Sequence, residues 1–117
     1  MLKINVTDAL GRFDNDREIY LELLETFIAL PPYDFTEMKR MLEREDTLSV
    51  MKFMHKIKGG ALTIGAEALA HTTSRLEECI RTCTDDNPAE LLLEVEKSYL
   101  QTLVALAALR DEFHTLH

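Results

Sequence analysis

Apolar residues recur every three or four positions along most of the chain, which is the spacing of an amphipathic α-helix. The first long stretch of this kind should end near Leu30, because Pro31 and Pro32 follow it. Its expected core side chains are Ile19, Leu23, Leu24, Phe27, Ile28 and Leu30. A short amphipathic piece at residues 6–13 and an acidic cap cluster at residues 14–16 precede this helix.

Two helix starts follow the prolines. Asp34, with Glu37 three residues later, resembles a capping box and opens a helix whose apolar positions are Phe35, Met38 and Leu42. Asp46 is expected to cap the next helix, which should end near Gly65. The segment therefore predicts two helices joined by a short connection.

Two more helices complete the pattern. Residues 66 to about 82 form one, with Leu69, Leu76 and Ile80 inward and Thr84, Asp85 and Asp86 at its end. Asn87 and Pro88 provide a cap and a first-turn proline for the last helix, which continues to about Phe113. No alternation of period two indicates a strand. The expected fold is all-α: an antiparallel up-down four-helix bundle with short additional N-terminal helical pieces.

Composition supports a single domain over residues 1–117, since 46% of the residues are apolar and glycine and proline are scarce. A net charge of −8 argues against nucleic acid or an anionic membrane as partner and favours proteins. The N-terminal residues lack the pattern of a signal peptide, and no run approaches the ~20 apolar residues of a membrane span. We therefore expect a cytoplasmic protein and a monomer.

Cys79 and Cys83 lie four positions apart in a helical pattern, where an unstrained disulfide is disfavoured. We interpret both as small packing residues in a reducing compartment. A metal-binding pair is the alternative, although no second ligand pair with suitable spacing is apparent.

Residues 54–66, MHKIKGGALTIGA, place a histidine and two lysines beside paired glycines. Each interior glycine costs a helix roughly 0.5–1 kcal/mol relative to alanine, so helix stability does not explain them. Winding the helix places its core face at Val50, Met54, Ile57, Ala61 and Ile64. His55 lies roughly 140° from the centre of that face and is expected to meet solvent.

The surroundings of His55 are basic and partly apolar. Between Asp46 and Glu67 the sequence holds Lys52, Lys56 and Lys58 but no acid, which predicts a local charge of +3. Leu48, Met51 and Leu62 are expected to be exposed on the same helix, and Gly59 shares the face of His55 and leaves its ring uncrowded. We interpret Leu48, Met51, Lys52, Lys56 and Leu62 as a docking surface for a protein partner.

This pattern also indicates a chemistry. A neutral imidazole nitrogen can accept a phosphoryl group, and neighbouring lysines can stabilise the added negative charge. The sequence has no G-x-x-x-x-G-K-[ST] phosphate loop, so the phosphoryl group would have to come from a donor protein. As an exposed charge, Lys58 should contribute little to folding stability.

The sequence contains His55-Lys56-Ile57-Lys58-Gly59, then Gly65-Ala66, then Leu69 and Leu76-Glu77, preceded by ALGRFDNDREIYLELLETF at residues 9–27. In this order, these motifs resemble the histidine-containing phosphotransfer (HPt) domain of bacterial two-component phosphorelays. The sequence departs from the family pattern at Lys56, Gly60 and Thr73. We interpret Lys56 as tuning of the local charge, and we expect the paired Gly60 to loosen the turn.

The resemblance implies a helical bundle whose His55 accepts a phosphoryl group from the aspartyl phosphate of a receiver domain and passes it to another receiver. It implies charge stabilisation by Lys58 and steric clearance at Gly59. Receiver domains and a hybrid histidine kinase would be the partners. Magnesium would belong to the receiver, and this chain would bind no cofactor or metal and have no independent turnover.

Three alternatives stay open. The chain could be the phosphoacceptor domain of a chemotaxis-type histidine kinase, or a helical interaction module without phosphate. A carboxylate-bridged di-metal bundle is disfavoured because Glu67 and His71 are four apart and have no twin. His71, His114 and His117 are expected to be ordinary surface or boundary residues.

Overall fold

The computed structural model describes residues 4–11, 13–29, 33–82 and 86–115, and these form six helices and no strand, which confirms the all-α prediction. The helices are α1 (Val6–Gly11), α2 (Arg17–Ala29), α3 (Phe35–Glu43), α4 (Thr47–Ile64), α5 (Glu67–Thr82) and α6 (Pro88–Thr115). Some predictions fall outside the described residues, namely those on Leu30, Pro31, Pro32, Cys83, Thr84, Asp85 and His117.

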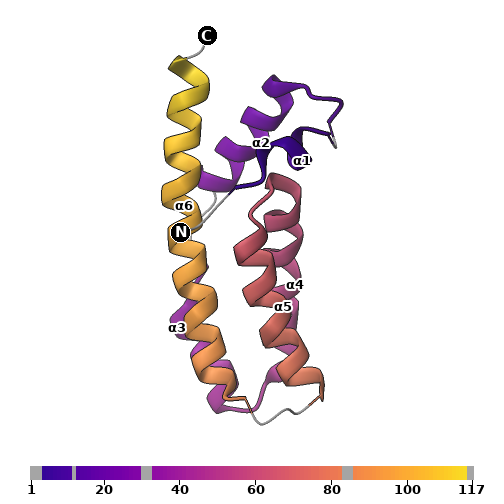
Figure 1. Ribbon diagram of the computed structural model, residues 1–117. Helices are drawn as coiled ribbons and strands as arrows, with labels where there is room; N and C mark the ends of the chain where they lie inside the picture. Colours follow the sequence, from indigo (N-terminus) through magenta and orange to yellow (C-terminus); the bar gives the residue numbers. More distant parts are fainter. Residues whose placement is uncertain (1–3, 12, 30–32, 83–85, 116–117) are drawn as a thin grey trace.

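The helices form an elongated bundle with extents of 49 × 23 × 23 Å. The α4 and α5 helices make an antiparallel hairpin, and α6 runs along its side for the whole length of the molecule (Figure 1). The remaining side is divided between two helices: α3 packs on α4 and α6 at one end, and α2 packs on the same two helices at the other. The bundle thus completes its fourth position with two shorter helices in succession.

Side-chain caps define the start of α4, the helix that carries His55. The Asp46 carboxylate accepts hydrogen bonds from the Ser49 backbone N–H at 3.3 Å and from the Ser49 hydroxyl at 2.8 Å. Asp34 caps α3 in the same way by accepting from the Glu37 backbone N–H at 3.0 Å. The caps predicted at Asp34 and Asp46 are thus confirmed, and each depends on residues only three positions apart.

The end of α4 depends on distant parts of the chain as well. Gly65 adopts a left-handed conformation with φ of +83°, which ends the helix. A β-carbon at Gly65 would collide with the backbone carbonyl of Asn5, whose N–H donates to the Gly65 carbonyl at 2.8 Å. The Tyr20 hydroxyl donates to the Ile64 carbonyl at 2.7 Å. The N-terminal segment and α2 therefore hold this helix end in place.

Burial agrees with the predicted face of α4 but corrects that of α2. Val50, Met54, Ile57, Ala61 and Ile64 are all buried, as predicted. In α2 the buried residues are Tyr20, Leu24 and Phe27, whereas Ile19 is 43% exposed and Leu23 and Ile28 are half-buried. The reason is tertiary: Tyr20 bonds to Ile64 and packs edge-on against Phe113 at 5.8 Å, which turns its side of α2 inward.

The inner face of α5 contains polar as well as apolar side chains. Leu69 and Leu76 are buried as predicted, and Ile80 is half-buried. Thr73 and Glu77 are also buried, and Cys79 packs in the core, as expected for a small packing residue. Among the described helices, none is long and apolar enough to cross a lipid bilayer.

Candidate functional site

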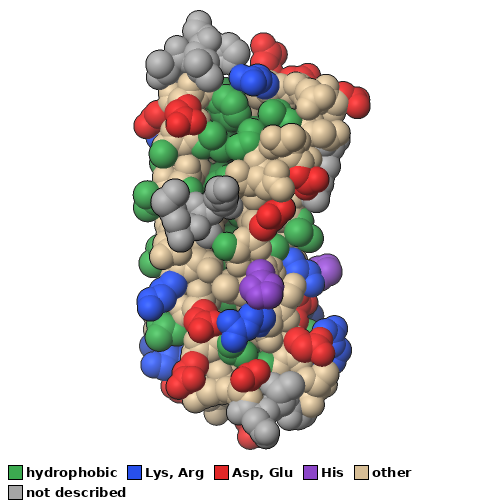
Figure 2. All heavy atoms as spheres, viewed as in Figure 1, with side chains coloured by type: hydrophobic (Ala, Val, Ile, Leu, Met, Phe, Trp, Pro, Cys, Tyr) green, Lys and Arg blue, Asp and Glu red, His purple; other side chains and the backbone are tan. Residues whose placement is uncertain are grey.

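The His55 side chain is exposed at the middle of α4, on the side of the helix away from its buried stripe. Figure 2 shows histidine and Lys or Arg side chains, with acidic side chains among them, on the surface near mid-height of the molecule, over the α4 and α5 helices. The imidazole is therefore open to a second molecule. An accessible imidazole can act as a nucleophile toward an electrophilic group on a partner.

Lys58 lies three residues after His55 and reaches across to α5. Its ammonium nitrogen is 2.8 Å from Oε1 of Glu77, a carboxylate that is only 7% exposed, while the Lys58 side chain is 29% exposed. The two groups form an ion pair. The predicted local charge of +3 is wrong, because Lys58 pairs with Glu77 of the next helix, which lies outside the segment from Asp46 to Glu67.

Glu77 is a residue of the candidate site for which the motif Leu76-Glu77 predicted no partner. The sequence pattern nevertheless indicates that Glu77 needs one, because it is an acid on the apolar side of α5, next to Leu76 and one turn from Thr73. A charged residue in such a stripe needs a counter-charge, and Lys58 supplies it.

The two adjacent glycines have different surroundings. Gly59 is exposed and lies in regular helix, and a β-carbon there would meet no atom within 4 Å. Gly60 faces α2, and a β-carbon there would lie 3.2 Å from Cε2 of the buried Phe27. The expectation that Gly60 loosens the turn is wrong. Gly60 lies within the unbroken α4 helix, and its lack of a side chain allows α2 to pack closely against α4.

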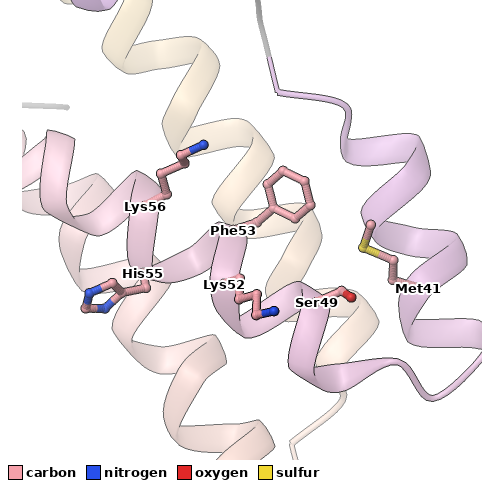
Figure 3. Close-up of a pocket in the computed structure, with 6 residues that line it drawn as sticks. All are labelled: Met41, Ser49, Lys52, Phe53, His55 and Lys56. Carbon is pink, nitrogen blue, oxygen red and sulfur yellow. The ribbon is translucent and has the colours of Figure 1, made fainter.

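The predicted docking residues all lie on α4 and surround His55. Leu48 is 68% exposed and Leu62 is 43% exposed, so two large apolar side chains meet solvent at either end of this surface. Lys52 and Lys56 are exposed, and Met51 is half-buried. The structure therefore brings the five residues onto one accessible surface, although Lys56 turns toward the α3 side of the helix (Figure 3).

A groove of about 400 Å³ lies beside His55, between α3 and α4. It is lined by Met41, Ser49, Lys52, Phe53, His55 and Lys56. Met41 and Phe53 stand on facing sides of it, whereas the imidazole of His55 points away from it (Figure 3). Residue spacing within one helix does not predict this groove, because Met41 belongs to a different helix from the other five residues.

Charges near the start of α4 favour an ionised cap. Hydrogen bonds from the Ser49 hydroxyl and backbone N–H, with the nearby charges of Arg44 and Lys52, hold the pKa of the Asp46 carboxyl below its usual value. Within the described part of the chain, no group of three or more His, Cys, Asp or Glu side chains is placed to hold a metal ion.

Comparison with known proteins adds one finding. A family model described as the Hpt domain matches residues 22–116, a range that includes every candidate site residue named above. Neither a curated protein nor a solved structure gives a significant match to the sequence.

Proposed function

Because the chain belongs to the Hpt domain family, whose members act in phosphotransfer in two-component systems, we propose that His55 is its phosphoacceptor. One observation carries this assignment: His55 is exposed at mid-helix beside a glycine whose β-carbon position is open to solvent. A phosphorylated partner can therefore bring its reacting group close to the imidazole.

The proposed reaction exchanges one phosphorus bond for another. A neutral ring nitrogen of His55 attacks the phosphorus of an aspartyl phosphate on a receiver domain, and an N–P bond forms while the P–O bond to the aspartate breaks. The aspartate leaves as a carboxylate, and the second ring nitrogen of His55 releases its proton to solvent. Transfer to a second receiver reverses these steps, so the chain acts as a carrier without turnover of its own.

The neighbouring residues have distinct roles in this proposal. Lys58 stabilises the negative charge of the phosphoryl group, and Glu77, 2.8 Å from its ammonium, holds that side chain against α5 in the free protein. Gly59 provides the clearance for approach. Leu48, Met51, Lys52, Lys56 and Leu62 contact the receiver, which brings its own magnesium ion. The receiver domains and a hybrid histidine kinase are the proposed partners.

The test uses receiver domains from the same genome, each purified and phosphorylated at its aspartate with radiolabelled acetyl phosphate that is then removed. At least one should transfer label to this protein, and the product should be labile to acid and stable to base, as a phosphoramidate is. His55→Gln should abolish labelling while the circular dichroism spectrum and melting temperature stay the same.

His71→Gln is the matched control, because His71 is another exposed helical histidine, on α5. It should be labelled like the unmodified protein. Labelling of the His55→Gln variant would contradict the assignment. Failure of every receiver to label the unmodified protein would favour an interaction module that does not carry phosphate.

A further inference from the structure

We propose that the groove between α3 and α4 is a specificity pocket that receives an apolar side chain of the receiver domain, flanked there by acidic residues. This inference rests on the proposed function, since it names a feature of the same partner. The groove is lined by Met41 from α3 and by five residues of α4, one of which is His55. It is therefore continuous with the surface on which the proposed reaction takes place.

The floor and walls of the groove favour an apolar occupant. Met41 and Phe53 are half-buried and face each other across it (Figure 3). The one hydroxyl in the lining belongs to Ser49, and it already donates to the Asp46 carboxylate at 2.8 Å. A polar side chain entering here would lose water without gaining that hydroxyl as a donor, whereas an apolar one would bury surface on both walls.

The groove is also preformed on one side. The Phe53 ring packs edge-on against Tyr33 at 6.4 Å, and Tyr33 packs against Tyr99 at 5.5 Å. Tyr99 is in the core and also contacts the rings of Phe27 and Phe35. This series of aromatic contacts fixes the Phe53 wall, while the flexible Met41 can adapt to the shape of the occupant. Little ordering is then required when a partner binds.

The charges on the rim indicate what flanks the apolar side chain. Lys52 and Lys56 are both exposed, and no acid is among the residues that line the groove. No ion pair to Lys56 occurs within the described part of the chain. Two adjacent exposed lysines favour a partner surface that places acidic side chains beside the groove.

The position of this pocket next to His55 connects it to phosphoryl transfer. The reacting atoms must approach to about 3–3.5 Å, so a receiver that is placed for transfer also covers the side chains next to His55. The imidazole points away from the groove while Lys56 and Phe53 turn toward it (Figure 3). A receiver that contacts both sides of α4 is fixed in position across the helix, and the groove selects receivers that carry the matching side chain.

The first experiment measures transfer rates against receiver concentration for Met41→Ala and Lys56→Glu. Both should raise the half-saturating concentration of the cognate receiver, Lys56→Glu by about tenfold, and Met41→Ala should leave the maximal rate within about twofold of the unmodified value. Lys97→Glu on α6 is the matched control, because it makes the same change of charge at an exposed lysine outside the groove. Its half-saturating concentration should stay within about twofold.

The second experiment follows methionine methyl groups by NMR with ¹³C-methyl methionine while unphosphorylated receiver is added. The Met41 methyl resonance should shift with receiver concentration, whereas Met38, which is buried in the same helix, should not. Shifts at Met51 without Met41, together with unchanged half-saturation in both groove variants, would overturn the pocket and leave the proposed function intact. Absence of transfer in the unmodified protein would instead overturn the proposed function.

Discussion

At the scale of single residues, Gly59 and Gly60 show how two identical neighbours can be required for different reasons. Gly60 lies where α2 crosses α4, and a β-carbon there would be 3.2 Å from the Phe27 ring. At Gly59 the same atom would meet nothing within 4 Å, and the backbone is ordinary helix. Neither backbone conformation nor packing within the described chain requires glycine at position 59.

We therefore expect Gly59→Ala to raise the free energy of unfolding by about 0.5–1 kcal/mol, because alanine has the higher helix propensity. Gly59→Gln should also fold, but its side chain should hinder approach to His55 and slow transfer from a phosphorylated receiver. Thermal melting and transfer rates of both variants test this. Gly60→Ala is the control, and it should gain less stability than Gly59→Ala because the Phe27 ring must shift.

Two outcomes would count against steric clearance at Gly59. One is a Gly59→Gln variant that transfers at the unmodified rate. The other is a Gly59→Ala variant that melts several degrees lower, since a loss of that size indicates a packing role that the surroundings of Gly59 do not show.

Lys58 contributes to stability through its neighbour. The expectation that Lys58 behaves as an exposed charge is wrong, because its partner Glu77 is almost completely buried. Lys58→Met should leave that carboxylate without its cation and lower the free energy of unfolding by about 1–3 kcal/mol. The double variant Lys58→Met/Glu77→Gln should recover part of the loss, because it no longer buries a charge.

Chemical denaturation of Lys58→Met, Glu77→Gln and the double variant gives the coupling energy between Lys58 and Glu77 directly. Lys58→Met should slow phosphoryl transfer in both backgrounds, since the ammonium is absent from each. Equal stability of Lys58→Met and the unmodified protein would show that the ion pair contributes nothing to folding.

At the scale of elements, the contact between α2 and the end of α4 depends on one buried hydroxyl. Tyr20 donates to the Ile64 carbonyl at 2.7 Å, and burial raises the pKa of Tyr20 from 10.0 to about 12. The folded state therefore favours the protonated phenol. Stability from this group is fully present below pH 10 and is lost as the pH rises through 12, because the unfolded chain releases the proton first.

Tyr20→Phe should lower the free energy of unfolding near pH 7 by about 1–2 kcal/mol, since it removes the donor to a buried carbonyl. Its stability should then fall less steeply between pH 10 and 12 than that of the unmodified protein. Some decline should persist, because burial also raises the pKa of Tyr33 and Tyr99. Urea denaturation at several pH values measures both effects, and parallel curves for the two proteins would contradict the role given to Tyr20.

At the scale of the whole molecule, His55 is displayed on the side of a rod-shaped bundle. The molecule measures 49 × 23 × 23 Å, and His55 lies in the middle of the 18-residue α4 helix. A partner that reaches His55 meets α4 side-on, with the groove to α3 on one side and Lys58 with Glu77 on the other. The lysines of α4 lie in a protein whose net charge is −8, so an acidic partner is drawn to this side of the bundle.

The sequence by itself predicted the helices, the buried stripe of α4 and the exposure of His55. Asp34 and Asp46 cap their helices through residues three positions away, and the stripe from Val50 to Ile64 follows from helical geometry alone. These features depend on interactions within one or two turns. Such interactions are fixed by spacing, so a pattern of residues is enough to predict them.

Tertiary structure decided the rest. The buried face of α2 follows from the bond between Tyr20 and Ile64, which are 44 positions apart. The partner of Lys58 comes from α5, the tight contact at Gly60 comes from α2, and the Met41 wall of the groove comes from α3. Each depends on how two helices are rotated and shifted against each other, and the spacing of residues within one helix does not determine that arrangement.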